Sequence, residues 1–160
     1  MIEYRAPAVA ELAAMNAMML RSKGHWGYDE AFLAACAEEL TVEASNLKLH
    51  PVLVAFEDDA PIGMAKLLYE DGQCYLHHLF VAPDAMGRGI GHRLLDWARR
   101  SARAAGFKVM VIESDPHAAL FYEKLGAKRA GSVPSGSIPG RELPRFELTC
   151  QALHTGDRIL

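Results

Sequence analysis

Cysteine is scarce in this sequence, and histidine, although present, does not cluster. The three cysteines, Cys36, Cys74 and Cys150, are far apart and odd in number, which fits neither a disulfide framework nor a metal cluster. None of the seven histidines pairs with another at the helical spacing that metal ligation favours. We therefore expect a protein of a reducing cytoplasm that holds no metal ion.

The chain also lacks the features that direct a protein to a membrane or to nucleic acid. No apolar run approaches membrane-spanning length, and residues 1–5 lack the basic region and apolar core of a signal peptide. The net charge of -3 gives no reason to expect attraction to nucleic acid or to an acidic membrane surface.

What is present is typical of a soluble globular protein, with 51% hydrophobic and 23% charged residues. There is no linker, internal repeat or low-complexity tract. We therefore expect residues 1–160 to form one domain, with 151–160 as a flexible C-terminal tail.

The periodicity of apolar residues predicts an α+β fold. The helix after the glycines has an apolar stripe and joins two strands as a right-handed parallel crossover. The order of elements predicts a mixed, mostly antiparallel central sheet of about seven strands flanked by helices. Strands are expected at residues 2–5, 51–57, 62–69, 73–81, 108–113, 127–133 and 142–150, and helices at 9–20, 29–40, 90–105 and 115–125.

A glycine-rich turn connects the strand ending at Val81 to the long helix. Gly87, Gly89 and Gly91 allow the backbone to approach a ligand closely and leave amide groups uncovered. The helix offers its positive N-terminus at the same point. Uncovered amides beside a helix N-terminus form a phosphate-binding site.

Three interpretations of this turn compete. A dinucleotide-binding turn follows the first strand of a βαβ unit, whereas this turn follows an antiparallel meander. A Walker A loop needs Lys-Ser/Thr after its last glycine, and here Gly91 is followed by His92 and Arg93. The third interpretation is a tight turn that binds nothing.

The residues from Leu79 to Leu95 resemble the acetyl-CoA-binding motif of the GNAT superfamily of acyl-CoA-dependent N-acetyltransferases. Its pattern is Gln/Arg-x-x-Gly-x-Gly/Ala, matched here at Met86, Gly89 and Gly91. A second stretch, 115–127, resembles the family's Asn-x-x-Ala-x-x-Phe-Tyr-x-x-x-Gly-Phe motif. Departures from the two patterns are Met86 for Gln or Arg, Asp115 for Asn, and Ala127 for Phe.

The resemblance implies acetyl-CoA as the donor co-substrate. The amides of residues 88–92 would hold its pyrophosphate, and the side chains of Arg88 and Arg93 are candidates for the outer phosphates. The backbone of residues 79–81 would pair with the pantetheine arm, and the amide of Phe80 or Val81 would donate to the thioester oxygen. The implied cofactor-binding residues are Leu79, Phe80, Val81, Met86, Gly87, Arg88, Gly89, Ile90, Gly91, His92, Asp115 and Phe121.

Acetyl transfer to an amine needs a base, donors to the oxyanion and an acid for the leaving thiolate. The resemblance makes Tyr122 the acid, with a core tyrosine as the alternative. His77 matches, by spacing from the glycine turn, a base histidine of the serotonin N-acetyltransferase type. Glu113 is a second candidate, either as a base acting through water or as a ligand for a cationic amine. Both His77 and Glu113 have a plain packing or solvation role as their alternative. His78 is expected to face the opposite way from His77.

Acceptor specificity is expected to come from two loops, at residues 22–28 and 135–141. Trp26 and Tyr28 offer ring surfaces, Tyr75 shares a strand face with His77, and Arg141 could pair with a substrate carboxylate. Ordinary loop packing is the alternative for each. The segment 143–148 could supply a sheet edge for a homodimer.

These observations predict an N-acetyltransferase that moves an acetyl group from acetyl-CoA to a primary amine of a small molecule by direct attack. Two alternatives stay open. One is acetylation of a protein lysine or N-terminus, and the other is a non-catalytic module that senses acyl-CoA.

Overall fold

In the computed structural model of the chain, residues 1–150 are described, and the tail expected at 151–160 lies outside them. Seven strands form within these residues: β1 Ile2–Arg5, β2 Val52–Glu57, β3 Ala60–Glu70, β4 Gln73–Val81, β5 Val109–Glu113, β6 Lys128–Pro134 and β7 Glu142–Thr149. The helices are α1 Leu12–Gly24, α2 Glu30–Leu40, α3 Ala44–Leu49, α4 Ile90–Ala104 and α5 Ala119–Lys124. Three short 3-10 turns complete the pattern of these residues, η1 Val9–Glu11, η2 Pro83–Ala85 and η3 Pro116–Ala118.

The strands form one sheet in the order β1-β2-β3-β4-β5-β7-β6. Neighbouring strands are antiparallel except for β4 and β5, which are parallel and joined by the α4 crossover. The predicted mixed, mostly antiparallel sheet is confirmed. Because its parallel pair lies at the centre, the sheet divides there into an N-terminal and a C-terminal half.

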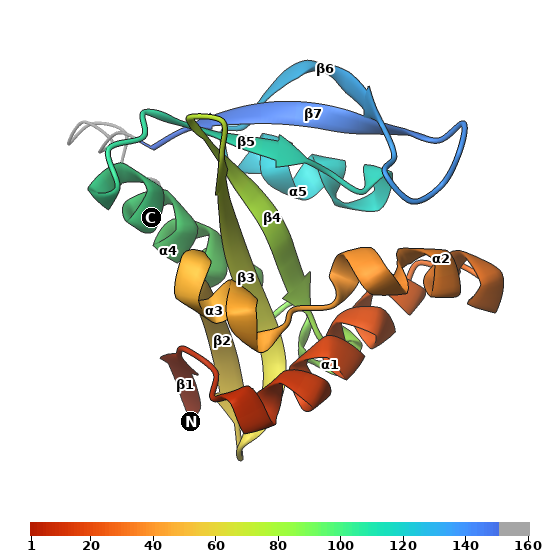
Figure 1. Ribbon diagram of the computed structural model, residues 1–160, viewed down its shortest axis with the longest axis vertical. Helices are drawn as coiled ribbons and strands as arrows, with labels where there is room; N and C mark the ends of the chain where they lie inside the picture. Colours follow the sequence, from red (N-terminus) through yellow and green to blue (C-terminus); the bar gives the residue numbers. More distant parts are fainter. Residues whose placement is uncertain (151–160) are drawn as a thin grey trace.

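Helices cover both faces of the sheet: α1 and α3 cross in front of β2–β4, while α4 lies behind these strands and α5 behind β5 (Figure 1). The apolar stripe of α4 is buried, as its spacing predicts: Ile90, Leu94, Leu95, Ala98 and Ala102 all face the core. This packing fixes the start of α4 against the centre of the sheet, directly after β4.

Three local elements differ from the sequence-based expectation. The helix expected at 9–20 begins as η1 and continues as α1 to Gly24. The α3 helix was not expected, because its six residues carry no apolar stripe; Asn46 caps its start by accepting a 2.8 Å hydrogen bond from the Glu43 amide. The helix expected at 115–125 begins instead as η3 and becomes α-helical only at Ala119. Pro116 opens that turn, and the Asp115 side chain caps it.

The expectation that residues 143–148 supply a free sheet edge is wrong. They lie in β7, which pairs with β5 on one side and with β6 on the other. The edge strands of the described sheet are β1 and β6. The last hairpin places β7 between β5 and β6, so β7 lies inside the sheet and β6 lies at its edge.

Candidate active site

A cavity of about 730 Å³ opens where β4 and β5 separate. The two strands pair at Cys74–Met110 and Tyr75–Val111 and then diverge, so that within residues 1–150 the rest of β4 is paired through β3 alone. The cavity walls come from the end of α1, from α2, β4, the glycine turn, the starts of α4 and α5, and the loop at 135–141. Its volume is in the range of small-ligand and cofactor sites.

A β-bulge places two imidazoles on the same side of β4. Lys66 of β3 lies opposite His78 and Leu67 lies opposite Leu76, which leaves His77 as the extra residue. The rings of His77 and His78 stack with centroids 4.3 Å apart, and both residues line the cavity. The expectation that the two histidines face opposite ways is therefore wrong, because the bulge interrupts the alternation of the strand.

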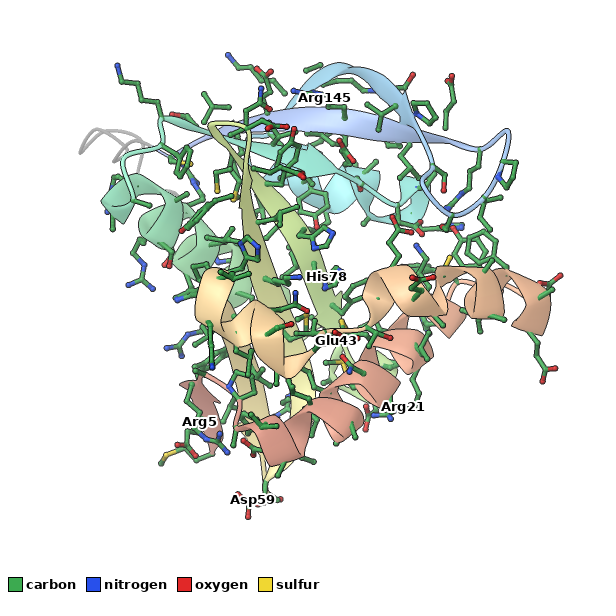
Figure 2. The ribbon with its side chains drawn as sticks, in the orientation of Figure 1. Arg5, Arg21, Glu43, Asp59, His78 and Arg145 are labelled. Atoms are coloured by element: carbon green, nitrogen blue, oxygen red, sulfur yellow. The ribbon has the colours of Figure 1, made fainter. Side chains whose placement is uncertain are left out.

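His78 is buried between β4 and α2 (Figure 2). Its Nε2–H donates to the Glu39 carbonyl at 3.1 Å, since a carbonyl only accepts, and this fixes the tautomer. The buried Nδ1 has no partner among residues 1–150. Burial lowers the pKa of His78 to about 3, and the neighbouring His77 and Lys66 add to this shift.

His77 lines the cavity and is exposed there, and its ring stacks on that of His78. Partial desolvation by the neighbouring protein, with the positive charge of Lys66 adding to it, lowers the pKa of His77 to about 4. Both imidazoles are therefore neutral near pH 7.

Acidification from pH 6.5 to pH 4 is expected to lower the free energy of unfolding. In this window the unfolded chain binds protons on His77 and His78 that the folded chain does not bind, so the stabilisation is complete above pH 6.5 and is lost as the pH falls. The buried His78 contributes a slope of about 1.4 kcal/mol per pH unit, and the exposed His77 contributes less because solvent screens its charge. Urea unfolding between pH 4 and pH 7.5 measures the slope, which His78→Gln should reduce. An identical slope in this variant would contradict the assignment.

Tyr122 is buried on α5, with its ring against Phe121 and Phe146, and it lines the cavity. Within residues 1–150 its hydroxyl has no hydrogen-bond partner. Burial raises the pKa of Tyr122, and the negative charge of Asp115 raises it further. The phenol is therefore protonated at neutral pH.

The glycine turn presents the start of α4 to the same cavity. Gly87 and Gly89 both have φ of 81°, which is a left-handed conformation, and Gly89 is the N-cap of α4. The first i to i−4 bond runs from the Arg93 amide to the Gly89 carbonyl at 3.1 Å, so the preceding amides of the helix have no intrahelical acceptor. A Cβ atom at Gly91 would lie 3.4 Å from the Phe121 ring.

The two arginines expected near the outer phosphates are engaged elsewhere. Arg88 forms a two-pronged ion pair with Glu57, with nitrogen–oxygen distances of 3.0 and 2.5 Å. The Arg93 guanidinium lies 4.5 Å from the centroid of the Tyr4 ring. Neither arginine lines the cavity. Apart from Arg88 and Arg93, every residue that the resemblance assigned to the cofactor does line it.

Three side chains line the cavity on its other side and a fourth, Tyr28, lies behind them; the four come from three separate segments of the chain. Lys23 Nζ lies 2.6 Å from Asp115 Oδ2, and the Tyr28 hydroxyl donates to both oxygens of Asp115, at 3.0 and 3.1 Å. Arg141 Nη2 contacts the Tyr28 hydroxyl at 2.7 Å and Asp115 Oδ2 at 3.3 Å. We call Lys23, Tyr28, Asp115 and Arg141 the acceptor-side cluster.

Charge pairing in this cluster keeps Asp115 ionised. Burial raises the pKa of Asp115, but its hydrogen bond to Lys23 and the other nearby donors outweigh burial, so the net pKa lies below the usual range. The cluster fastens the end of α1 to the turn before α5 and to the loop at 135–141.

Among the predicted acceptor residues, Trp26, Tyr75 and Arg141 line the cavity with His77 and Glu113, whereas Tyr28 lies behind Arg141. The indole of Trp26 stacks on His117, with ring centroids 5.2 Å apart. The sequence-based prediction missed several lining residues, although two of them, Lys23 and Ser137, lay in loops already singled out. The missed residues include Lys23, Cys36, Glu39, His117 and Ser137.

Within residues 1–150, no three side chains of His, Cys, Asp or Glu come together as metal ligands would. The helices of the same residues are too short or too polar to cross a lipid bilayer.

A mixed sheet that separates beside a glycine-headed helix agrees with the resemblance noted in the sequence. Residues 48–126 match the family model described as the acetyltransferase (GNAT) domain. The peptidyl-lysine N-acetyltransferase YjaB of Salmonella typhimurium is 37% identical over 82 residues, which are 51% of this chain and 52% of that protein. The chain therefore matches about half the length of this curated relative.

Two solved structures share the whole fold. The PaiA N-acetyltransferase of Thermoplasma acidophilum, solved with coenzyme A, has a TM-score of 0.74 at 22% identity, covering 93% of this chain and 99% of that one. The YncA protein of Salmonella typhimurium, solved with its cofactor acetyl-CoA, has a TM-score of 0.67 at 25% identity and 99% coverage of both chains. The matched region, residues 48–126, belongs to the GNAT acetyltransferase family, and the solved structures extend the likeness in fold to nearly the whole chain.

Proposed function

We propose that the protein transfers an acetyl group from acetyl-CoA to a primary amine of a small molecule by direct attack. The observation that carries this proposal is the composition of the cavity between β4 and β5. It contains uncovered amides at the start of α4, an unpaired strand edge, the hydroxyl of Tyr122 and the neutral imidazole of His77. A small acceptor suits the acceptor-side cluster, which closes this end of the cavity with interlocked side chains.

The donor is placed by backbone groups. The amides at the start of α4 face the pyrophosphate, where the helix dipole favours negative charge. The free edge of residues 79–81 offers donors and acceptors to the pantetheine arm, as an added strand would. In this placement the amide of Phe80 or Val81 donates to the thioester oxygen as it becomes an oxyanion.

The chemistry then needs two proton transfers. The amine nitrogen forms a bond to the thioester carbonyl carbon, and the proton that the nitrogen loses goes to His77, or to Glu113 through water. When the tetrahedral intermediate collapses, the carbon–sulfur bond breaks and the Tyr122 hydroxyl donates its proton to the leaving thiolate. The raised pKa of Tyr122 keeps the proton available until the thiolate forms.

His77→Ala is expected to lower kcat/KM by about 100-fold at every pH between 6 and 8, without changing the shape of the profile. The reason is that the pKa of His77 is about 4, so the imidazole is already in its base form over this whole range. Steady-state rates of thiol release measure the effect, with Glu113→Gln assayed beside it. Wild-type rates in His77→Ala, with a large loss in Glu113→Gln, would transfer the role of base to Glu113.

Acetylation of a protein lysine is the second candidate, favoured by the activity for which the relative YjaB is named. Thiol release from acetyl-CoA with a panel of small amines and with lysine-containing peptides decides between the two. Faster turnover of the small amines supports the proposal, and turnover of peptides alone contradicts it. Binding of CoA without turnover of any acceptor would indicate a sensor of acyl-CoA instead.

A further inference from the structure

The acceptor-side cluster carries more positive than negative charge. Lys23 and Arg141 both contact the same oxygen of Asp115, at 2.6 and 3.3 Å. Within residues 1–150, no second carboxylate lies within ion-pair distance of either cation. Burial and the nearby Asp115 raise the pKa of Tyr28 to about 12, so its phenol adds no charge at neutral pH. Two cations therefore share one anion at the wall of the cavity.

Both cations also have hydrogen-bond donors without an acceptor among residues 1–150. Arg141 makes both of its contacts through Nη2, and its Nε and Nη1 donate to no residue in the described part of the chain. Lys23 Nζ has three protons and one hydrogen-bonded partner there. A guanidinium with a free edge can bind a carboxylate through two parallel hydrogen bonds.

Aromatic rings hold these cations in place. The rings of Tyr28 and Phe32 stack with centroids 3.9 Å apart. The guanidinium carbon of Arg141 lies 4.9 Å from the Phe32 centroid, and Lys23 Nζ lies 5.5 Å from the Tyr28 centroid. Because both side chains are 12–18% exposed and supported in this way, they lose little conformational entropy when a ligand binds.

We infer that Lys23 and Arg141 bind a carboxylate group of the acceptor, which makes the acceptor an amino-acid-like compound carrying both an amine and a carboxylate. This inference rests on the proposed function. Other walls of the same cavity carry the carboxylates of Glu39, Glu70 and Glu113, which attract the protonated amine as it enters. An amine without an anionic group would leave the surplus positive charge at the cluster uncompensated.

Matched acceptor pairs test the inference: β-alanine against propylamine, 4-aminobutyrate against butylamine, and each L-amino acid against its carboxamide. For each acceptor, kcat/KM of the variant is divided by kcat/KM of the wild type. Comparing these ratios within a pair removes the effect of the different amine basicities. Arg141→Gln is expected to lower kcat/KM for the carboxylate member by about 10- to 100-fold. The kcat/KM for the other member of the pair and the KM for acetyl-CoA should both change by less than about twofold, which is well below a tenfold change.

Arg100→Gln is the matched control, because Arg100 pairs with Asp96 at 3.1 Å on the exposed face of α4, away from the cavity. This variant should leave all the ratios unchanged. Equal losses for both members of each pair would overturn the inference, since Arg141 would then only position its loop. Turnover restricted to amines without a carboxylate would overturn it while leaving the proposed function intact. Turnover of no amine at all would contradict the proposed function, and the inference with it.

Discussion

Tyr122→Phe is expected to lower kcat by about 100-fold to 10,000-fold while leaving the affinity for acetyl-CoA unchanged. The substitution removes one hydroxyl from the cavity wall and keeps the ring that packs between Phe121 and Phe146. That hydroxyl is protonated at neutral pH, because burial raises the pKa of Tyr122. Without it, the thiolate leaves without a proton donor. Thiol release at saturating acetyl-CoA measures kcat, and calorimetric titration with CoA measures the affinity.

Tyr69→Phe provides the control for this variant. Tyr69 is half-buried, stacks on Phe107 and does not line the cavity, so loss of its hydroxyl should leave kcat unchanged. The melting temperature of Tyr122→Phe should also stay near that of the wild type, since the hydroxyl makes no hydrogen bond within residues 1–150. A variant that melts normally and turns over at the wild-type rate would reduce Tyr122 to a packing residue.

The features that the sequence could predict are those that depend on neighbouring residues. The three glycines, the apolar stripe of α4 and the apolar strand at 108–113 lie within about thirty consecutive residues, and together they predict a parallel crossover with a helix N-terminus at its start. The structure confirms the crossover and brings the glycine turn to the cavity. Local sequence was sufficient to predict these elements, because the strand and the helix each carry an apolar face to bury and the turn is marked by its glycines.

The features that the sequence could not predict depend on contacts between distant segments. The bulge at His77 arises from the register between β3 and β4, and nothing in the local sequence marks it. Lys23 and Asp115 are 92 residues apart, and Arg141 comes from a loop without any periodic pattern. Asp115 departs from the Asn of the family motif, and the sequence does not show that Lys23 and Arg141 lie beside its carboxylate.

Gly89→Asp is expected to weaken CoA binding by at least about 100-fold, or about 2.7 kcal/mol. The introduced carboxylate lies beside the uncovered amides at the start of α4 and would compete with the pyrophosphate for them, besides repelling its charge. The fold should tolerate the change. An anion at a helix N-terminus is favourable by about 0.3–1 kcal/mol, which offsets part of the strain at the left-handed φ of 81°. Calorimetric titration with CoA measures the loss of affinity, and thermal unfolding measures the stability.

Gly106→Asp separates this electrostatic effect from backbone strain. Gly106 follows the opposite end of α4 and also has a positive φ, of 93°, and a Cβ atom added there would meet no atom within 4 Å. The same substitution there places a negative charge at the negative end of the same helix, which is unfavourable. Gly106→Asp should therefore melt at a lower temperature than Gly89→Asp and still bind CoA like the wild type. If both variants lost CoA affinity equally, the loss would follow from strain in α4, and the pyrophosphate would not lie at the start of this helix.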